Sequence, residues 1–295
     1  MKRAAAIVVS LMVFSALIPA AAQKPLRIEV AVDLVHVNFS ATDRKGRMAT
    51  GLTAQDFVVE EDGTPQTITL FASERELPLT LAVLVDISPS VASVLQEEKN
   101  TASRFLGSVM GTRDLALVMS FNSGVTLLQD FTEDVPTLQK AILDLKLSGS
   151  GTSLYDAVYL AAEEKLSREV GRKAIVLISD GDDTTSTYDA GKAMIAAHRN
   201  NVVIYGISNS GGSRTLRRMT EETGGAFFEV RREGDFEKAF DQIAVELRTQ
   251  YSLGYHSTNR LRDGSFRRIR IIPNDSNIRV RTRRGYYAAQ DVRTP

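Results

Sequence analysis

The central part of the chain alternates short apolar runs with segments in which apolar residues recur every three or four positions. The apolar runs, which include β-branched residues, predict buried strands, and the longer periodicity predicts amphipathic helices. Strands are expected at residues 79–85, 114–121, 125–131, 173–179, 202–207 and 226–230. Helices are expected at residues 91–109, 154–166, 188–198, 214–222 and 236–250. This alternation predicts an α/β fold with a doubly wound, mainly parallel sheet.

The two flanks of this part show the period-two pattern of β-strands instead. Residues 28–39 alternate, and Asp62-Gly63 is a strong hairpin signal between expected strands at 57–60 and 66–71. Further strands are expected at residues 251–255, 266–272 and 278–283. Because small isolated sheets are marginally stable, we expect the N- and C-terminal segments to pair as one small flanking β domain. The expected boundaries are 23–77, 78–250 and 251–295.

Oxygen-bearing side chains follow two of the expected strands. Asp86 ends the first apolar run, and Ser88 and Ser90 follow at alternate positions, while Asp180 ends another run and Thr152 precedes a helix. Because open α/β sheets bind ligands outside the carboxyl ends of their strands, we expect these three loops to converge there. Oxygen donors of this kind suit a hard divalent cation, and Mg²⁺ in particular retains water and accepts few protein ligands.

This constellation resembles the metal-ion-dependent adhesion site (MIDAS) of von Willebrand factor type A (VWA) domains. The family pattern is Asp-x-Ser-x-Ser, then a Thr, then an Asp, and Asp86, Ser88, Ser90, Thr152 and Asp180 match it without a substitution. The resemblance implies a VWA fold, a short antiparallel edge strand at 125–131 and a cation held by these five residues. The structural alternative is a helix N-cap at Asp86 with turn residues at the other positions.

The flanks extend the resemblance beyond the α/β part. Tyr-x-Leu-Gly-Tyr from Tyr251 and Arg-x-Gly-Tyr-Tyr up to Tyr287 resemble bacterial secreted proteins of the "VWFA-related domain" family. An α/β domain inserted into a β-sandwich is also similar to the arrangement in integrin β subunits. Membership of such a family implies binding and does not name a ligand.

The N-terminus predicts export. Lys2 and Arg3 precede the apolar stretch 4–18 and an Ala-x-Ala site, so a signal peptide at 1–22 is expected, cleaved after Ala22. The apolar run is short of the ~20 residues that span a bilayer, which argues against stable membrane insertion. The absence of cysteine excludes disulfides, thiolate chemistry and a lipid-modified cysteine. We expect a secreted or periplasmic protein.

Enzyme motifs are incomplete. A phosphatase of the haloacid dehalogenase type needs a second Asp two residues after its nucleophile, and that position is Ser88. A serine hydrolase needs a base and a Gly-x-Ser-x-Gly turn; the turn is missing, and His36, His198 and His256 lie in patterns typical of structural residues. Residues 149–152 lack the lysine of a phosphate-binding loop. We therefore expect no enzymatic activity.

The charge pattern argues against nucleic acid as a partner. The 36 basic and 36 acidic residues cancel, and the ten arginines between Arg248 and Arg284 are not interleaved with base-stacking aromatic residues. We expect an exposed strand face whose arginines prevent edge-to-edge pairing. Asp156, Asp182 and Asp183 are interpreted as helix or turn acids rather than ligands.

These observations lead to one hypothesis and one alternative. The hypothesis is a secreted, metal-dependent, adhesion-type protein, in which a partner's Asp or Glu carboxylate completes the coordination of Mg²⁺, or of Mn²⁺ or Ca²⁺. The alternative is a scaffold or assembly factor of envelope complexes with a non-catalytic metal. The identity of the partner and the oligomeric state stay open.

Overall fold

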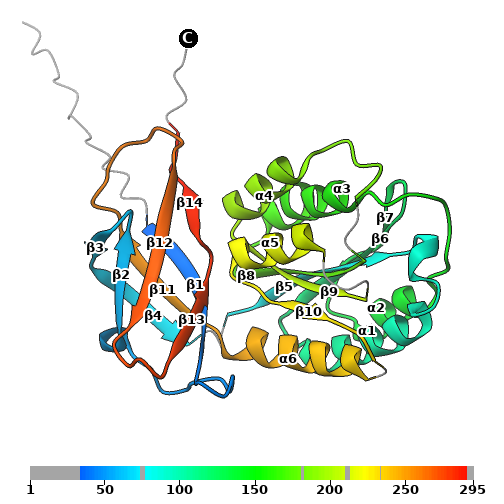
Figure 1. Ribbon diagram of the computed structural model, residues 1–295, viewed down its shortest axis with the longest axis horizontal. Helices are drawn as coiled ribbons and strands as arrows, with labels where there is room; N and C mark the ends of the chain where they lie inside the picture. The colour runs from blue at the N-terminus through cyan, green and yellow to red at the C-terminus, as the bar shows by residue number, and fades with distance from the viewer. Residues whose placement is uncertain (1–33, 74–76, 181–182, 210–212, 233, 291–295) are drawn as a thin grey trace, which may run out of the picture. The chain divides into compact units, whose positions relative to one another are not determined.

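The computed structural model describes residues 34–73, 77–180, 183–209, 213–232 and 234–290 (Figure 1). The predicted signal peptide, its cleavage site after Ala22 and the start of the strand expected at 28–39 lie outside the described residues. Within the described part, no helix is long and apolar enough to cross a membrane.

A six-stranded sheet forms the centre of the α/β part, in the order β10-β9-β8-β5-β6-β7. Its strands are β5 (Leu79–Asp86), β6 (Leu115–Phe121), β7 (Val125–Thr132), β8 (Arg172–Ile178), β9 (Val202–Ser208) and β10 (Phe227–Glu229). All neighbours are parallel except β7, which pairs antiparallel with β6. The predicted fold class and the antiparallel edge strand are both confirmed.

Helices cover both faces of this sheet (Figure 1). One face packs against α1 (Leu95–Val109), α2 (Val135–Leu143) and α6 (Asp235–Thr249). The other packs against α3 (Leu154–Tyr159), α4 (Ala190–Arg199) and α5 (Arg214–Thr223). Every residue of β5 is buried because the strand is central and covered on both sides.

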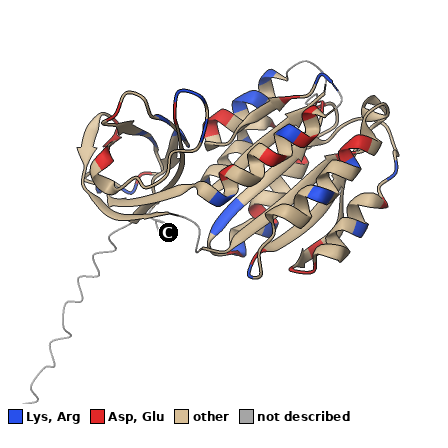
Figure 2. Ribbon diagram, turned by 90° about the horizontal axis from the view of Figure 1, so that it is seen from below, with Lys and Arg blue, Asp and Glu red and all other residues tan. Residues whose placement is uncertain are grey.

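The helices differ from the prediction in three places. Helix α2 was not predicted, and α1 starts at Leu95, after a separate 3-10 turn at Pro89–Val91. The helix expected at 154–166 is α-helical only as far as Tyr159 and continues as a π-helix over Leu160–Lys165. Basic and acidic positions are interspersed along the helices (Figure 2), in line with a net charge of +0.

The flanking segments form two four-stranded antiparallel sheets, ordered β13-β1-β11-β4 and β14-β12-β2-β3. Their strands are β1 (Leu34–Thr42), β2 (Phe57–Glu61), β3 (Thr64–Gln66), β4 (Ile68–Ser73), β11 (Tyr251–His256), β12 (Phe266–Pro273), β13 (Arg279–Thr282) and β14 (Gly285–Tyr287). The strand β1 pairs with β11 and β13, and β12 pairs with β2, so N- and C-terminal strands share both sheets. One apolar core that includes Val37, Val59, Leu253 and Ile269 joins the two sheets.

The hairpin predicted at Asp62-Gly63 is present. Both residues have positive φ, 48° and 82°, and Glu61 pairs with Thr64 across the turn. The strand expected at 66–71 is divided, however, because β3 pairs with β2 in one sheet and β4 pairs with β11 in the other. The chain therefore changes sheets at Thr67.

Two of the tail's arginines contradict the expected exposed arginine face. Arg267 is 3% exposed and Arg283 is 9% exposed. Arg267 forms an ion pair with the buried carboxylate of Glu61 (3.4 Å), to which the Tyr255 and Tyr286 hydroxyls each donate a hydrogen bond at 2.9 Å. The buried charges are tolerated because each has a partner.

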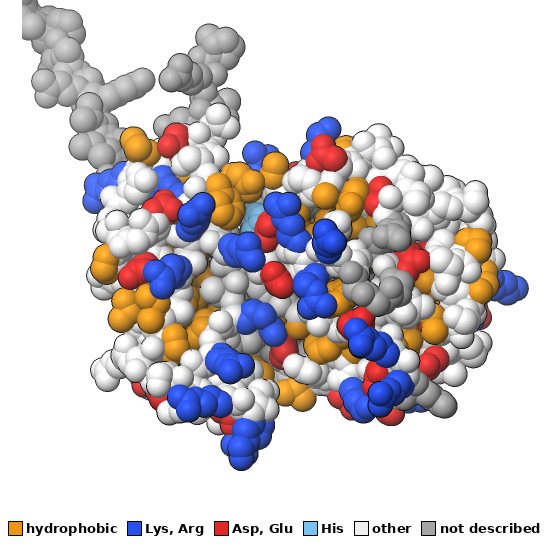
Figure 3. Space-filling model, in the orientation of Figure 1, with side chains coloured by type: hydrophobic (Ala, Val, Ile, Leu, Met, Phe, Trp, Pro, Cys, Tyr) orange, Lys and Arg blue, Asp and Glu red, His pale blue; other side chains and the backbone are white. Residues whose placement is uncertain are grey.

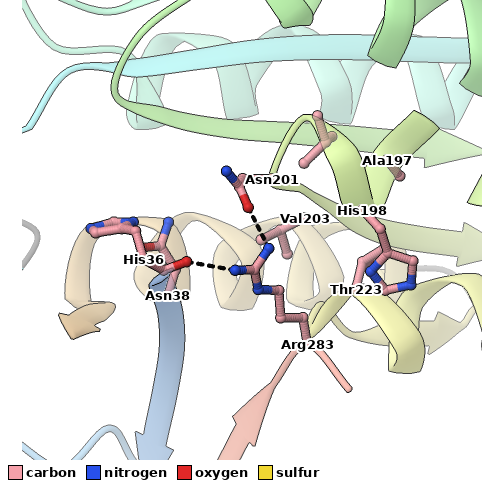
Figure 4. Close-up of a pocket in the computed structure, with 9 residues that line it drawn as sticks. His36, Asn38, Ala197, His198, Asn201, Val203, Thr223 and Arg283 are labelled. Atoms are coloured by element: carbon pink, nitrogen blue, oxygen red, sulfur yellow. Dashed lines mark hydrogen bonds between the residues drawn. The ribbon is translucent and has the colours of Figure 1, made fainter. Parts of the chain in front are cut away.

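Arg283 links the β segments to the α/β part (Figure 4). Its guanidinium donates to the backbone oxygen of His36 on β1 at 2.7 Å and to the side-chain oxygen of Asn201, which lies between α4 and β9. Burial, together with the charge of Arg283, lowers the pKa of His198 to about 4. His198 is therefore neutral near pH 7.

The C-terminal end of α6 is held by several side chains. Arg172 donates to the backbone oxygen of Leu247, and the Gln250 amide donates to the Tyr205 hydroxyl at 2.9 Å. The buried Glu246 forms an ion pair with Arg281 on β13. The contacts on α6 thus join it both to the α/β sheet and to the flanking strands.

Asp114 also holds the end of α6, and two substitutions of different expected cost test this contact. Its carboxylate accepts hydrogen bonds from the backbone nitrogens of Leu79 (2.8 Å) and Gly111 (2.7 Å) and from Arg248 of α6 (2.7 Å). We expect Arg248→Ala to cost about 1 kcal/mol, because Asp114 keeps two donors, and Asp114→Ala to cost about 2 kcal/mol, because two backbone donors lose their acceptor. Urea denaturation of both variants measures the difference, and equal losses would contradict it.

Candidate metal centre

Asp86 ends β5 and is fully buried. Its carboxylate accepts a hydrogen bond from the Ser88 backbone nitrogen at 2.9 Å and another from the Ser179 hydroxyl at 2.8 Å. Burial raises the pKa of Asp86, and the nearby Asp180 charge adds to the increase, while these hydrogen bonds oppose it. The ionised form of Asp86 is thus unfavourable unless a cation compensates it.

Ser88 and Ser90 place two hydroxyl oxygens after Asp86, 2.9 Å apart. Ser88 is buried and has an extended backbone, and Ser90 is exposed within the 3-10 turn Pro89–Val91. The N-cap of α1 is Val94, so the alternative role of Asp86 as the cap of that helix is not observed.

Thr152 follows a glycine-containing turn on the second loop. Gly151 has a φ of +84°, and a Cβ there would lie 2.6 Å from the Thr185 side chain, so this position requires glycine. Thr152 is buried, and its hydroxyl makes no hydrogen bond with another described residue. That oxygen is thus available as a ligand.

Asp180 lies on the third loop, directly after Ser179 at the end of β8. The Ser208 hydroxyl donates to its backbone oxygen at 3.3 Å. The charge of Asp180 contributes to raising the pKa of both Asp86 and Glu98. Its carboxylate therefore interacts electrostatically with both of these groups at the edge of the sheet.

Hydrogen bonds join the three loops. The Ser148 nitrogen donates to the Ile87 oxygen at 3.1 Å, which connects the first loop with the second. The Thr152 nitrogen donates to the Thr184 hydroxyl, and the Thr184 nitrogen donates back to the Thr152 oxygen, both at 2.9 Å. The three loops expected to converge are therefore held together at the carboxyl edge of the sheet.

Sequence reasoning missed Glu98, a buried carboxylate on α1 that belongs to the same region. Glu98 is 2% exposed, and its Oε2 atom has no hydrogen-bond partner in the described structure. Burial, together with the charges of Asp86, Asp180 and Glu97, raises the pKa of Glu98 to about 8. The available signal was its place on the apolar stripe of α1, between Leu95 and Ala102.

The donor set fits a hard cation. Apart from burial, the groups that raise the pKa of Glu98 are all carboxylates, so the region has an excess of negative charge. Among the described residues, no group of three or more His, Cys, Asp or Glu side chains is arranged to hold a metal. A cation here would therefore depend on the serine and threonine hydroxyls together with the aspartates, a set that suits Mg²⁺ and not a soft metal.

Two further acids support the loops, as expected from the sequence. The Asp156 carboxylate accepts hydrogen bonds from the Thr187 and Tyr188 nitrogens at 2.8 to 3.0 Å, and Asp183 accepts one from the Tyr155 nitrogen at 3.2 Å. Asp182, which received the same interpretation, lies outside the described residues.

The α/β part of the chain matches a known protein family. The von Willebrand factor type A domain matches residues 80–242, more than half of the chain. The chain belongs to the VWA family. The matched range contains α1 to α5 and all six strands of the central sheet apart from the first residue of β5. A comparison with curated proteins gives no match.

Solved structures show the same fold at low sequence identity. A von Willebrand factor type A protein from Catenulispora acidiphila is 11% identical, with a TM-score of 0.52 over 88% of this VWA chain and 74% of that one. Proximal thread matrix protein 1 from the mussel byssus, with a zinc-occupied MIDAS motif, is 17% identical, with a TM-score of 0.51 over 63% of this chain and 49% of that one.

Proposed function

We propose that the protein is a secreted or periplasmic, non-catalytic binding protein that recruits an acidic side chain of a partner through a divalent cation. The observation that carries the proposal is the pair of hydroxyls of Ser88 and Ser90, 2.9 Å apart, beside the buried Asp86. Neutral oxygens and a surplus of buried negative charge occur together at the edge of the sheet where α/β folds bind ligands.

The proposed ligands are Asp86, Ser88, Ser90, Thr152 and Asp180. The hydroxyls supply neutral oxygens that leave much of the cation's charge uncompensated, so a cation bound here would supply an open position for an incoming carboxylate. The hydrogen bonds that join the three loops fix these oxygens before a partner arrives, which limits the ordering cost of binding. The exposed Ser90 lies at the side open to a partner.

Mg²⁺ is the proposed cation, with Mn²⁺ and Ca²⁺ as the other hard candidates. The zinc-occupied MIDAS motif of the mussel protein supports a divalent ion at this position in a related fold. In this chain the absence of cysteine and the oxygen donors favour a harder ion than zinc.

The anchoring of α6 favours a second candidate, a rigid scaffold for envelope complexes. The contacts from Arg172, Gln250 and Arg281 fix this helix to two parts of the chain. In that case the metal stabilises the loops and the partner binds elsewhere.

Affinity capture separates the two candidates. Wild-type protein and the Ser90→Ala variant are immobilised, exposed to envelope extract of the native cells with Mg²⁺ or EDTA, and the retained proteins are compared by mass spectrometry. We expect a partner that is retained with Mg²⁺, released by EDTA and lost with Ser90→Ala. Amidation of the extract's carboxylates with carbodiimide and glycinamide should abolish the retention. Ser276→Ala, at an exposed turn, is the matched control.

Retention of the same proteins in EDTA and by Ser90→Ala would contradict metal-dependent capture and favour the scaffold.

N-terminal sequencing of the exported protein tests the proposed cleavage, with Gln23 expected as the first residue.

A further inference from the structure

A cleft of about 690 Å³ lies between helices α4 and α5 and the strands β12 and β14. Its floor is apolar and includes Met194, Ile195, Met219, Phe266 and Tyr287. None of the proposed metal ligands lines it. The volume is in the range of sites that hold small ligands or protein side chains.

Part of the floor is held in a fixed arrangement. The ring of Phe266 packs edge-on against Tyr287, with ring centroids 5.1 Å apart, and against His198, with centroids 5.5 Å apart. Phe266 is nevertheless 39% exposed, which is unusual for a packed phenylalanine. The thioethers of Met194 and Met219 supply an adaptable surface beside this aromatic cluster.

The rim of the cleft is basic. Arg218, Arg268, Arg270 and Arg284 line it, and Glu222 is the one acidic residue among the described lining residues. Figure 3 shows basic side chains around exposed apolar side chains on this side of the molecule.

Most of these arginines have weak partners. Arg218 pairs with Glu222 at 2.6 Å, Arg270 with Glu60 at 3.2 Å and Arg284 with Glu221 at 3.4 Å, and all three arginine side chains are more than half exposed. Exposed pairs of this kind contribute little to stability, so an incoming carboxylate can compete for the arginines. The guanidinium group of Arg268 makes no hydrogen bond or ion pair with any described residue.

We propose that this cleft binds an extended segment of a second protein in which large apolar side chains are flanked by Asp or Glu. The apolar floor accommodates the apolar side chains, and the arginine rim complements the carboxylates. A peptide fits better than an anionic lipid, because the charges lie along both walls of the cleft, on α5 and on β12, whereas a fatty acid presents one charge and a long alkyl chain. The inference does not depend on a metal at the edge of the central sheet.

The test uses fluorescein-labelled hexapeptides of the form acid-acid-apolar-apolar-acid-acid, as an equimolar mixture with Asp or Glu at the outer positions and Leu, Ile, Phe or Met at the inner ones. Fluorescence anisotropy is recorded on the full mature chain with EDTA present throughout, so that carboxylate binding at the metal centre does not contribute. A second mixture has Asn and Gln in place of the acids, and a third has Ser in place of the apolar residues.

We expect the acidic-apolar mixture to bind, and the other two mixtures to bind much more weakly. Arg268→Glu should weaken binding about 10- to 100-fold, since it removes a charge-assisted contact and adds a like charge. The same variant should gain affinity for a mixture with Lys and Arg at the outer positions. Arg279→Glu, an exposed arginine of β13 outside the cleft, is the matched control and should change neither affinity.

Three results would overturn the proposal. The first is no binding of the acidic-apolar mixture up to about 1 mM, and the second is equal binding of the neutral mixture. The third is binding of decanoate, but not of the peptides, with the same dependence on Arg268, which would assign the cleft to a small amphiphile.

Discussion

Replacing Asp86 with asparagine is expected to weaken Mg²⁺ binding by about 100-fold or more, because the variant loses the most buried of the proposed anionic ligands. Asparagine is a better replacement than alanine, since the two oxygens of the fully buried carboxylate accept hydrogen bonds from the Ser88 nitrogen and the Ser179 hydroxyl. An amide oxygen can still accept one of these bonds, and the amide nitrogen can donate to the hydroxyl of Ser179. Isothermal titration calorimetry with MgCl₂ and MnCl₂ measures the change.

The same variant should behave differently without metal. Burial and the Asp180 charge raise the pKa of Asp86, so the metal-free wild type loses stability as the pH rises above the unfolded-state pKa of that group. In EDTA at pH 7, Asp86→Asn should therefore be at least as stable as wild type. Asp241→Asn, at an exposed position of α6, is the control. Unchanged metal affinity in Asp86→Asn would contradict the site assignment.

Replacing Glu98 with glutamine is expected to raise the free energy of unfolding of the metal-free protein at pH 9 by up to about 5 kcal/mol. The folded protein keeps this buried carboxyl protonated up to a pKa of about 8, whereas the usual pKa of a glutamate side chain is 4.5. Between these two pH values the unfolded chain binds fewer protons than the folded one, so the contribution of Glu98 falls as the pH rises. Glutamine removes this fall because it stays neutral.

Urea denaturation in EDTA at pH 4.5, 7 and 9 gives the pH dependence. Wild type and Glu98→Gln should be similar at pH 4.5 and diverge above it, while Glu133→Gln, at an exposed position, should follow wild type. In Glu98→Gln the fall in stability with pH should be smaller than in wild type but not absent, since Asp86 adds its own contribution. Parallel curves for wild type and Glu98→Gln would show that Glu98 is ionised in the fold.

The fold class could be predicted because it depends on hydrophobic patterns that extend over whole strands and helices. The buried runs of β5 and β8 and the apolar stripe of α6 are clear in the sequence, and the order of strands and helices then favours one architecture. Helix α2 was missed because only Leu138 and Ile142 of its residues are buried, so its apolar periodicity is weak. Its capping residue, Asp134, which accepts a hydrogen bond from Thr137, was the better signal.

The site could be predicted in part for a similar reason. Asp86, Ser88 and Ser90 are close in sequence and follow a recognisable strand, so their proximity follows from local geometry. Glu98 and Ser179 join the site only through packing of α1 and through a hydrogen bond across strands, and neither contact leaves a pattern in the sequence. Likewise the burial of Arg267 depends on Glu61, which is more than 200 positions away.

The pairing of Ser73 with Tyr251 has a consequence for how the protein folds. Residues 74–250 occupy the place that a short turn has in a hairpin, since their two ends leave from neighbouring positions of β4 and β11. Closing an unfolded loop of about 180 residues costs roughly 3 kcal/mol more than closing a four-residue turn, by the logarithmic dependence on length. A folded α/β part would hold those ends close together and remove most of that cost. We therefore expect the α/β part to form first during folding, with the β-sandwich assembling only after the C-terminal strands have been synthesised.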